Sequence, residues 1–179
     1  DVYKRQILGH AAREGKSLAE IKDLADKIVP NIHTIGLALS GATVPGVGKP
    51  GFVLAEDEIE YGIGIHGEPG YRKESMQPSR QLAEELTGKL LEAFEAKLGE
   101  RYALLINGMG ATPLMEQYVF ANDVASILGD AGLDVTYKKL GNYMTSIDMA
   151  GYSITLLKLD AELKELVNAP ADTPAFVQV

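Results

Sequence analysis

The sequence contains no cysteine, no tryptophan and only three histidines. Without cysteine, the chain has no disulfide framework, no thiolate metal site and no thiol nucleophile. Three histidines without cysteine make no convincing zinc set, so we interpret His10 and His33 as structural or exposed residues. Any chemistry must come from other side chains.

Basic residues are scarce: 17 Lys and Arg stand against 25 Asp and Glu, which gives a formal net charge of −8, and no basic run exceeds two residues. Such a chain repels nucleic acids and anionic membranes at long range, so we expect neither as a partner. Long apolar runs and a signal-peptide pattern are also missing. We therefore expect no transmembrane helix and a cytoplasmic location.

The 179 residues, 46% of them hydrophobic, are enough for one globular domain. A chain of this size buries about 70% of the surface of the unfolded chain. Asp1 to Gln6 shows no helix or strand period that continues into the next residues. We interpret residues 1–6 as a non-native leader and residues 7–179 as the domain.

In the first third, Ile7 to Glu14 reads as the end of a helix that Gly15 terminates. Ser17 and Glu20 form a capping box before a second helix, which ends at Pro30. Its expected apolar stripe is Leu18, Ile21, Leu24, Ala25 and Ile28. Strands are expected at 34–39, 52–54 and 59–65, with loops at 40–51 and 66–78.

In the remainder, helices and strands alternate. A helix of about twenty residues carries Leu82, Leu86, Leu90, Phe94 and Leu98, and a second one at 113–131 is expected to bury Leu114, Tyr118, Ala121, Val124 or Ala125, and Leu128. Strands are expected at 102–106, 133–140 and 152–159, and a short helix at 161–167. This order predicts an α/β fold, a two-layer domain with helices packed on a mixed β-sheet of about six strands.

Two glycine-rich segments resemble nucleotide-binding loops without matching them. The run Thr43 to Pro50 lacks the first glycine and the Ser or Thr of a P-loop, and it leads into a strand-like run. The run Asn107 to Pro113 has Pro113 where the dinucleotide fingerprint needs its third glycine. We interpret it as a tight turn before a helix, with Thr112 as N-cap and Pro113 at the first helical position.

His66 stands in the most unusual stretch, Ile63 to Gly70, where a strand runs into a segment rich in Gly and Pro. A neutral imidazole is a nucleophile near physiological pH if one nitrogen is free and the other is held as N–H by an acceptor. Glu68 or a backbone carbonyl could be that acceptor, and a satisfied loop histidine is the alternative. In the polar loop at 142–149, Asp148 is a candidate base, although turn capping fits it better.

These motifs together resemble the K subunit of dihydroxyacetone kinase. The resemblance rests on Gly41-Ala42-Thr43-Val44-Pro45 and Gly48-Lys49-Pro50, on Gly62 to Gly70 with its G-I-H-G-E-P-G run, on Asn107 to Leu114, and on Thr145 to Met149 with Ser153 to Lys158. It is collinear from about Leu8 to the tail and corresponds to the C-terminal half of that subunit. An N-terminal domain would therefore be absent.

The resemblance implies that His66 binds dihydroxyacetone covalently as a hemiaminal, through addition of Nε2 to the carbonyl carbon. The family's glycine-rich histidine segment and its aspartate base belong to the other half, so this chain alone is expected to be inactive. The resemblance implies no cofactor in this chain, Mg-ADP on a separate L subunit, and a homodimer.

The phosphoenolpyruvate phosphotransferase type is favoured by where the chain ends. An ATP-dependent kinase with both regions in one chain, and a dihydroxyacetone-sensing transcriptional coactivator, are the alternatives.

Overall fold

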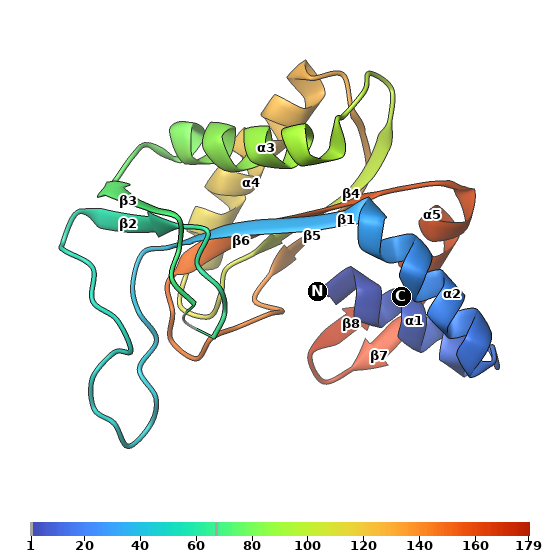
Figure 1. The fold of residues 1–179 in the computed structure, drawn as a ribbon, viewed down its shortest axis with the longest axis horizontal. Coiled ribbons are helices and arrows are strands. Elements are labelled where there is room, and N and C mark those ends of the chain that lie inside the picture. The colour runs from blue at the N-terminus through green and yellow to red at the C-terminus, as the bar shows by residue number, and fades with distance from the viewer. Residues whose placement is uncertain (1, 67) are drawn as a thin grey trace.

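A six-stranded mixed sheet runs through the centre of the computed structural model, which describes residues 2–66 and 68–179 (Figure 1). The elements run in the order α1 (Val2–Arg13), α2 (Leu18–Ile28), the 3-10 turn η1 (Val29–Asn31), β1 (Ile32–Ala38), β2 (Glu58–Tyr61), β3 (Arg72–Ser75), α3 (Ser79–Phe94), β4 (Arg101–Asn107), α4 (Leu114–Asp130), β5 (Asp134–Gly141), β6 (Gly151–Lys158), α5 (Ala161–Val167), β7 (Ala171–Thr173) and β8 (Phe176–Gln178).

The strands lie in the order β3-β2-β1-β6-β4-β5, and β7 pairs with β8 in a separate hairpin. Within the large sheet, β4 and β5 are parallel and the other neighbours are antiparallel. Parallel neighbours need a crossover connection, which α4 supplies between β4 and β5. The prediction of helices on a mixed sheet of about six strands is confirmed.

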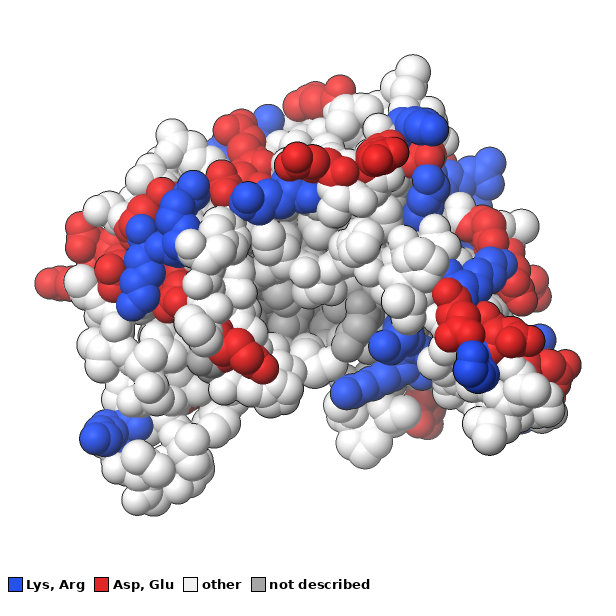
Figure 2. All heavy atoms as spheres, viewed as in Figure 1, with Lys and Arg blue, Asp and Glu red and all other residues white. Residues whose placement is uncertain are grey.

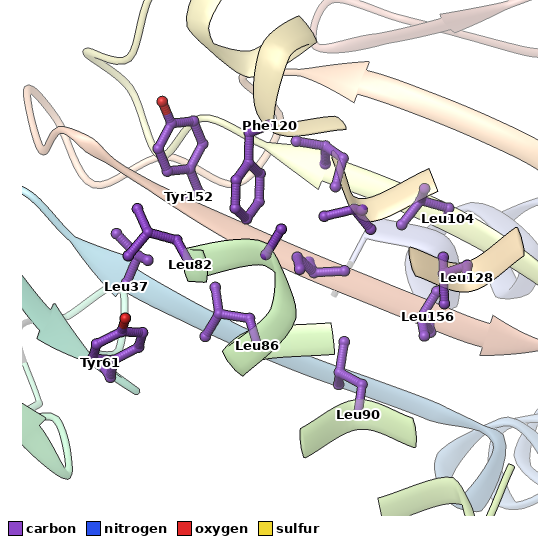
Figure 3. Packing of buried hydrophobic residues seen from close by; sticks show 14 of the residues in the cluster. Leu37, Tyr61, Leu82, Leu86, Leu90, Leu104, Phe120, Leu128, Tyr152 and Leu156 are labelled. Carbon is purple, nitrogen blue, oxygen red and sulfur yellow. The ribbon is translucent and has the colours of Figure 1, made fainter. Parts of the chain in front are cut away.

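Helices cover both faces of the sheet. On β4, Tyr102, Leu104 and Ile106 join the core under α3 and α4, whereas Ala103 and Leu105 join a second core with α1, α2 and α5. Successive side chains of a strand point to opposite faces, so one buried strand serves both cores. Figure 3 shows the first core, in which the ring of Phe120 stacks on that of Tyr152. The second set of helices adds a third layer to the two that were expected.

The first helix includes residues that were expected to lie outside the domain. Tyr3 is fully buried, and its hydroxyl donates to the Leu104 carbonyl at 2.7 Å. The exclusion of residues 2–6 from the fold was therefore wrong, and Asp1 lies outside the described residues. The interpretation of residues 1–6 as a non-native leader concerns the origin of this segment, and it stays a prediction.

The expected end of α1 and the expected start of α2 agree with the structure, while one residue of the apolar stripe of α2 does not. Gly15 adopts a φ of +84°, and Ser17 and Glu20 form the capping box. Leu18 was expected in the apolar stripe of α2 but is 83% exposed.

The expected strand at 52–54 does not form. β2 ends at Tyr61, four residues earlier than expected, because Gly62 turns the chain with a φ of +79°. β3 lies within the segment expected to be a loop, and the hairpin β7–β8 was not expected. α3 ends at Phe94, so Leu98 lies beyond the helix and is 85% exposed.

The buried face of α4 agrees with the prediction at Val124 and Leu128 but not at Leu114 and Tyr118. Its buried residues are Gln117, Phe120, Val124 and Leu128, whereas Leu114 and Tyr118 are exposed. None of the helices in the described part of the chain has the length and apolar character needed to cross a lipid bilayer.

Candidate functional site

The loop between β2 and β3 carries His66. At its start, Gly62 donates its N–H to the Gly36 carbonyl at 2.6 Å, and a Cβ at Gly62 would lie 2.5 Å from the Tyr71 ring. Only glycine combines a positive φ with this close approach. The chain therefore leaves the sheet sharply after Tyr61 and carries His66 away from the strand. Gly67 of the same motif lies outside the described residues.

The imidazole of His66 is paired with Glu68. His66 Nδ1 lies 3.0 Å from Glu68 Oε1, and the His66 backbone N–H donates to Glu68 Oε2 at 3.1 Å. Hydrogen bonds from its own backbone N–H and from His66 lower the pKa of the Glu68 carboxyl group below its usual range. An ionised carboxylate only accepts hydrogen bonds, so Nδ1 carries the proton and Nε2 of the neutral ring is unprotonated. The sequence left Glu68 and a backbone carbonyl as possible acceptors for the ring N–H, and in the structure the acceptor is Glu68.

His66 lines a cavity of about 570 Å³. Its wall consists of residues 62–66 on one side, strands β1, β4 and β6 above, and the start of α1 on the other side. Figure 2 shows a hollow in the middle of this face, with charged side chains gathered along its upper rim and on the left and right sides of the molecule, and few of them on its walls. The His66 side chain is 78% exposed, so a small solute reaches it directly.

Polar side chains from the strands face this cavity. Asn107 at the end of β4 donates to the Met144 carbonyl at 2.8 Å and to Ser153 Oγ at 3.1 Å, and its own oxygen accepts two backbone N–H groups. The hydroxyl groups of Thr34 and Thr155 lie 2.7 Å apart on β1 and β6. These contacts order one wall of the cavity, and they were not predicted, because nothing in a single strand shows which strands become neighbours.

The other two histidines are not brought to His66. His10 lies on α1 with its Nδ1 3.4 Å from Arg13, and the His33 ring packs edge-on against Phe94 with centroids 4.5 Å apart. Both placements agree with the interpretation of these histidines as structural or exposed residues.

Asp148 ties two loops together. Its carboxyl oxygen accepts the Thr43 backbone N–H at 2.6 Å, and this hydrogen bond lowers the pKa of Asp148. The contact is structural, as the preferred interpretation implied, but it links Asp148 to a distant loop and does not cap the turn of Asp148 itself. The run Thr43 to Pro50 forms the base and tip of a projecting loop, closed by a bridge between these two residues (Figure 1). No helix comes directly after it, as expected of a failed P-loop.

The turn after β4 differs in detail from the prediction. Pro113, not Thr112, is the N-cap of α4, and no side chain caps the helix. The Thr112 hydroxyl instead donates to the Gly151 carbonyl at 2.6 Å and accepts the Gly151 N–H at 2.8 Å. Thr112 therefore joins the start of α4 to β6.

Comparison with known proteins gives a consistent result. A family model described as the Dak1 domain matches residues 1–175. The dihydroxyacetone-binding subunit DhaK of the PTS-dependent dihydroxyacetone kinase of Lactococcus lactis subsp. lactis (strain IL1403) is 63% identical over 159 residues, which cover 89% of this chain and 48% of that protein. The DhaKLM operon coactivator DhaQ of the same organism is 46% identical over 178 residues, 98% of this chain and 53% of that protein.

Among solved structures, the dihydroxyacetone kinase of C. freundii in complex with AMP-PNP and Mg²⁺ superposes with a TM-score of 0.88 at 26% identity, over 99% of this chain and 32% of that chain. The chain spans about half the length of the two curated relatives. These matches confirm the resemblance predicted from the motifs.

Proposed function

Because the chain belongs to the Dak1 domain family, we propose that it is the substrate-binding part of a dihydroxyacetone kinase subunit, and that His66 holds dihydroxyacetone as a covalent hemiaminal. The observation that carries the proposal is the His66–Glu68 pair at the edge of the cavity. It holds the proton on Nδ1 and leaves the Nε2 lone pair free for a carbonyl carbon.

The addition balances in atoms and charge. The Nε2 lone pair forms a bond to the carbonyl carbon, the C=O π pair moves to the oxygen, and the resulting alkoxide takes a proton from solvent. The ring keeps the proton on Nδ1 and becomes cationic. Glu68, whose pKa is lowered, supplies the compensating negative charge at Nδ1.

This chemistry selects substrates by functional group. An imidazole adds to a ketone or an aldehyde but has no electrophilic carbon to attack in glycerol. Short carbonyl sugars are therefore favoured over polyols of the same size.

The rest of the reaction is assigned to other parts of the assembly. Phosphoryl transfer needs a positioned base and charge stabilisation at the nucleotide. Following the family resemblance, we assign the base to an N-terminal half, and Mg-ADP to a separate L subunit recharged by the phosphoenolpyruvate phosphotransferase system. The subunit is proposed to act as a homodimer.

A ligand-sensing coactivator is the second candidate. The 46% identity to DhaQ supports it, and the 63% identity to a DhaK subunit favours the kinase. An ATP-dependent kinase with both regions in one chain is the alternative within the family. The presence of His66 does not distinguish between the phosphotransferase-type subunit, the ATP-dependent kinase and the coactivator.

Native mass spectrometry of the full-length subunit with dihydroxyacetone tests the covalent role. We expect a mass increase equal to one dihydroxyacetone per subunit, lost in His66→Ala and kept in His10→Ala, which removes a histidine of α1 outside the loop. An unchanged adduct in His66→Ala would refute the assignment.

A further inference from the structure

Glu60 is a buried acidic residue next to the His66 loop. It lies on β2 between Ile59 and Tyr61, which both pack into the core under α3. Since neighbours on a strand point to opposite faces, Glu60 points away from that core. Glu60 is 6% exposed and is the only acidic or basic residue among the buried ones in the described part of the chain. A carboxyl group is costly to bury without a partner, so its contacts are informative.

The partner of Glu60 is the far end of the loop. Glu60 Oε1 accepts the Gly70 backbone N–H at 2.7 Å, and Oε2 lies 3.9 Å from Lys73 Nζ. A Cβ at Gly70 would lie 2.1 Å from the Tyr61 carbonyl oxygen, so only glycine permits this approach. The next residue, Tyr71, donates its N–H to the same carbonyl at 2.8 Å, directly before β3 pairs with β2.

The loop is thus attached to the sheet at both ends. Gly62 is held by the Gly36 carbonyl at the start, and Gly70 by the Glu60 side chain at the end. Between these points, the first half of the loop is held by packing, because Ile63 is buried with Met109 and Met149 and Ile65 packs against them. In the second half, Gly64 donates to the Glu68 carbonyl at 3.2 Å and Glu68 holds His66, so these contacts stay inside the loop. The position of Glu68, and with it the orientation of the imidazole, therefore depends on how the far end of the loop is attached at Gly70 and Tyr71.

We propose that Glu60 is a positioning residue for His66: by fixing Gly70 it holds the loop so that Nε2 stays directed at the cavity. The proposal rests on the proposed function of His66. Glu60 does not contact the substrate and acts through the backbone. Since a displacement of about 1 Å at a reacting group can cost about a hundredfold, loss of this attachment should weaken adduct formation strongly.

The test compares three variants of the full-length subunit. Glu60→Ala removes the acceptor for the Gly70 N–H, whereas Glu60→Gln keeps an oxygen acceptor in the same place. Glu58→Ala is the matched control, because Glu58 lies on the same strand and the same face and is also near Lys73, at 3.8 Å, without touching the loop. The readouts are hydrogen exchange of the 62–71 segment without ligand and the apparent Kd for the dihydroxyacetone adduct.

For Glu60→Ala we expect faster exchange in 62–71 and a rise in Kd of about tenfold or more. Glu60→Gln should stay within about threefold of the unaltered protein, and Glu58→Ala should not change either readout. Unchanged exchange and Kd in Glu60→Ala would overturn the proposal, as would equal losses in Glu60→Ala and Glu60→Gln. If the unaltered subunit forms no adduct, the proposed function fails, and the exchange measurement still decides whether Glu60 orders the loop.

Discussion

Two hydrogen bonds that the Glu68 carboxylate accepts from His66 set the tautomer and the position of the ring. Glu68 accepts from both the ring and the backbone N–H of His66, so it fixes the tautomer and the position of the ring together. Gly64 leaves room for this arrangement, since a Cβ there would lie 2.0 Å from Glu68 Oε2. The spacing in the motif thus has a physical reason: Gly64 makes room for the Glu68 side chain, and Glu68 is close enough to accept both hydrogen bonds from His66.

Replacing Glu68 separates its charge from its hydrogen bonds. We expect Glu68→Ala to weaken the adduct of the full-length subunit by about tenfold and Glu68→Gln by less, because an amide oxygen still accepts from Nδ1 but does not balance the cationic ring. The group is exposed, so the effect is moderate. Native mass spectrometry over a dihydroxyacetone titration gives both values.

The pH dependence of this pair is set by the direction of the pKa shift. The pKa of Glu68 is lower in the folded protein, so its contribution is present above the usual carboxyl pKa of about 4.3 and is lost as the pH falls through the lower folded value. The ratio of Kd between Glu68→Ala and the unaltered subunit should therefore be constant from about pH 7.5 to 9, which lies above the usual titration range of both a carboxyl and an imidazole group. A ratio that collapses toward one within this range would contradict the ionised state of Glu68.

Among single residues, the sequence singles out the proposed reactive residue but not the residues that hold it in place. His66 stands out because glycines and a proline surround it, which is a local signal. Glu60 and Asn107 carry no such signal, because Glu60 reads as one of several acidic residues before a strand. Its role depends on the return of the chain at Gly70, which is a contact across ten residues.

At the scale of elements, helix faces are the least certain part of a sequence reading. In α4, Leu114 and Tyr118 form a four-residue step that looks like a buried stripe, yet both are exposed. Val124 is buried as expected, and beside it Phe120, which was not expected to be buried, packs into the core and stacks its ring on that of Tyr152 on β6 with centroids 4.5 Å apart. Periodicity predicts the helix, and only the neighbouring strand decides its face.

A pair of substitutions in α4 tests this orientation. We expect Phe120→Ala to lower the free energy of unfolding by about 3 to 5 kcal/mol, since it removes a buried ring from the core in Figure 3. Tyr118→Ala should change it by no more than about 0.5 kcal/mol, since Tyr118 is 64% exposed. Urea denaturation of both variants gives the values. A larger loss for Tyr118→Ala than for Phe120→Ala would support the face predicted from the sequence.

For the whole molecule, the order of the strands explains where the cavity lies. β1 and β6 are neighbours at the centre although more than a hundred residues separate them, and the His66 loop leaves the sheet beside them. Alternating helices and strands are enough to predict the class of fold. They do not predict the third layer, because it depends on Tyr3, Leu24 and Leu163, which are distant in the sequence and share one core.

The division of labour between this domain and its proposed partners leads to a prediction about the reaction. In the proposed function, binding the carbonyl requires His66 and Glu68, whereas phosphoryl transfer requires a base and a positioned nucleotide. The glycine-rich histidine segment G-G-G-S-G-H-E-P, expected from the resemblance to supply part of that machinery, does not occur in the sequence. With purified L subunit and its phosphoryl donor, the 179-residue chain should therefore form no dihydroxyacetone phosphate, whereas the full-length subunit should form it. An enzymatic assay for the product, with circular dichroism to show that the short chain is folded, gives the comparison. Turnover by the folded 179-residue chain would contradict the prediction, and a full-length subunit that binds dihydroxyacetone but never phosphorylates it would favour the sensing role.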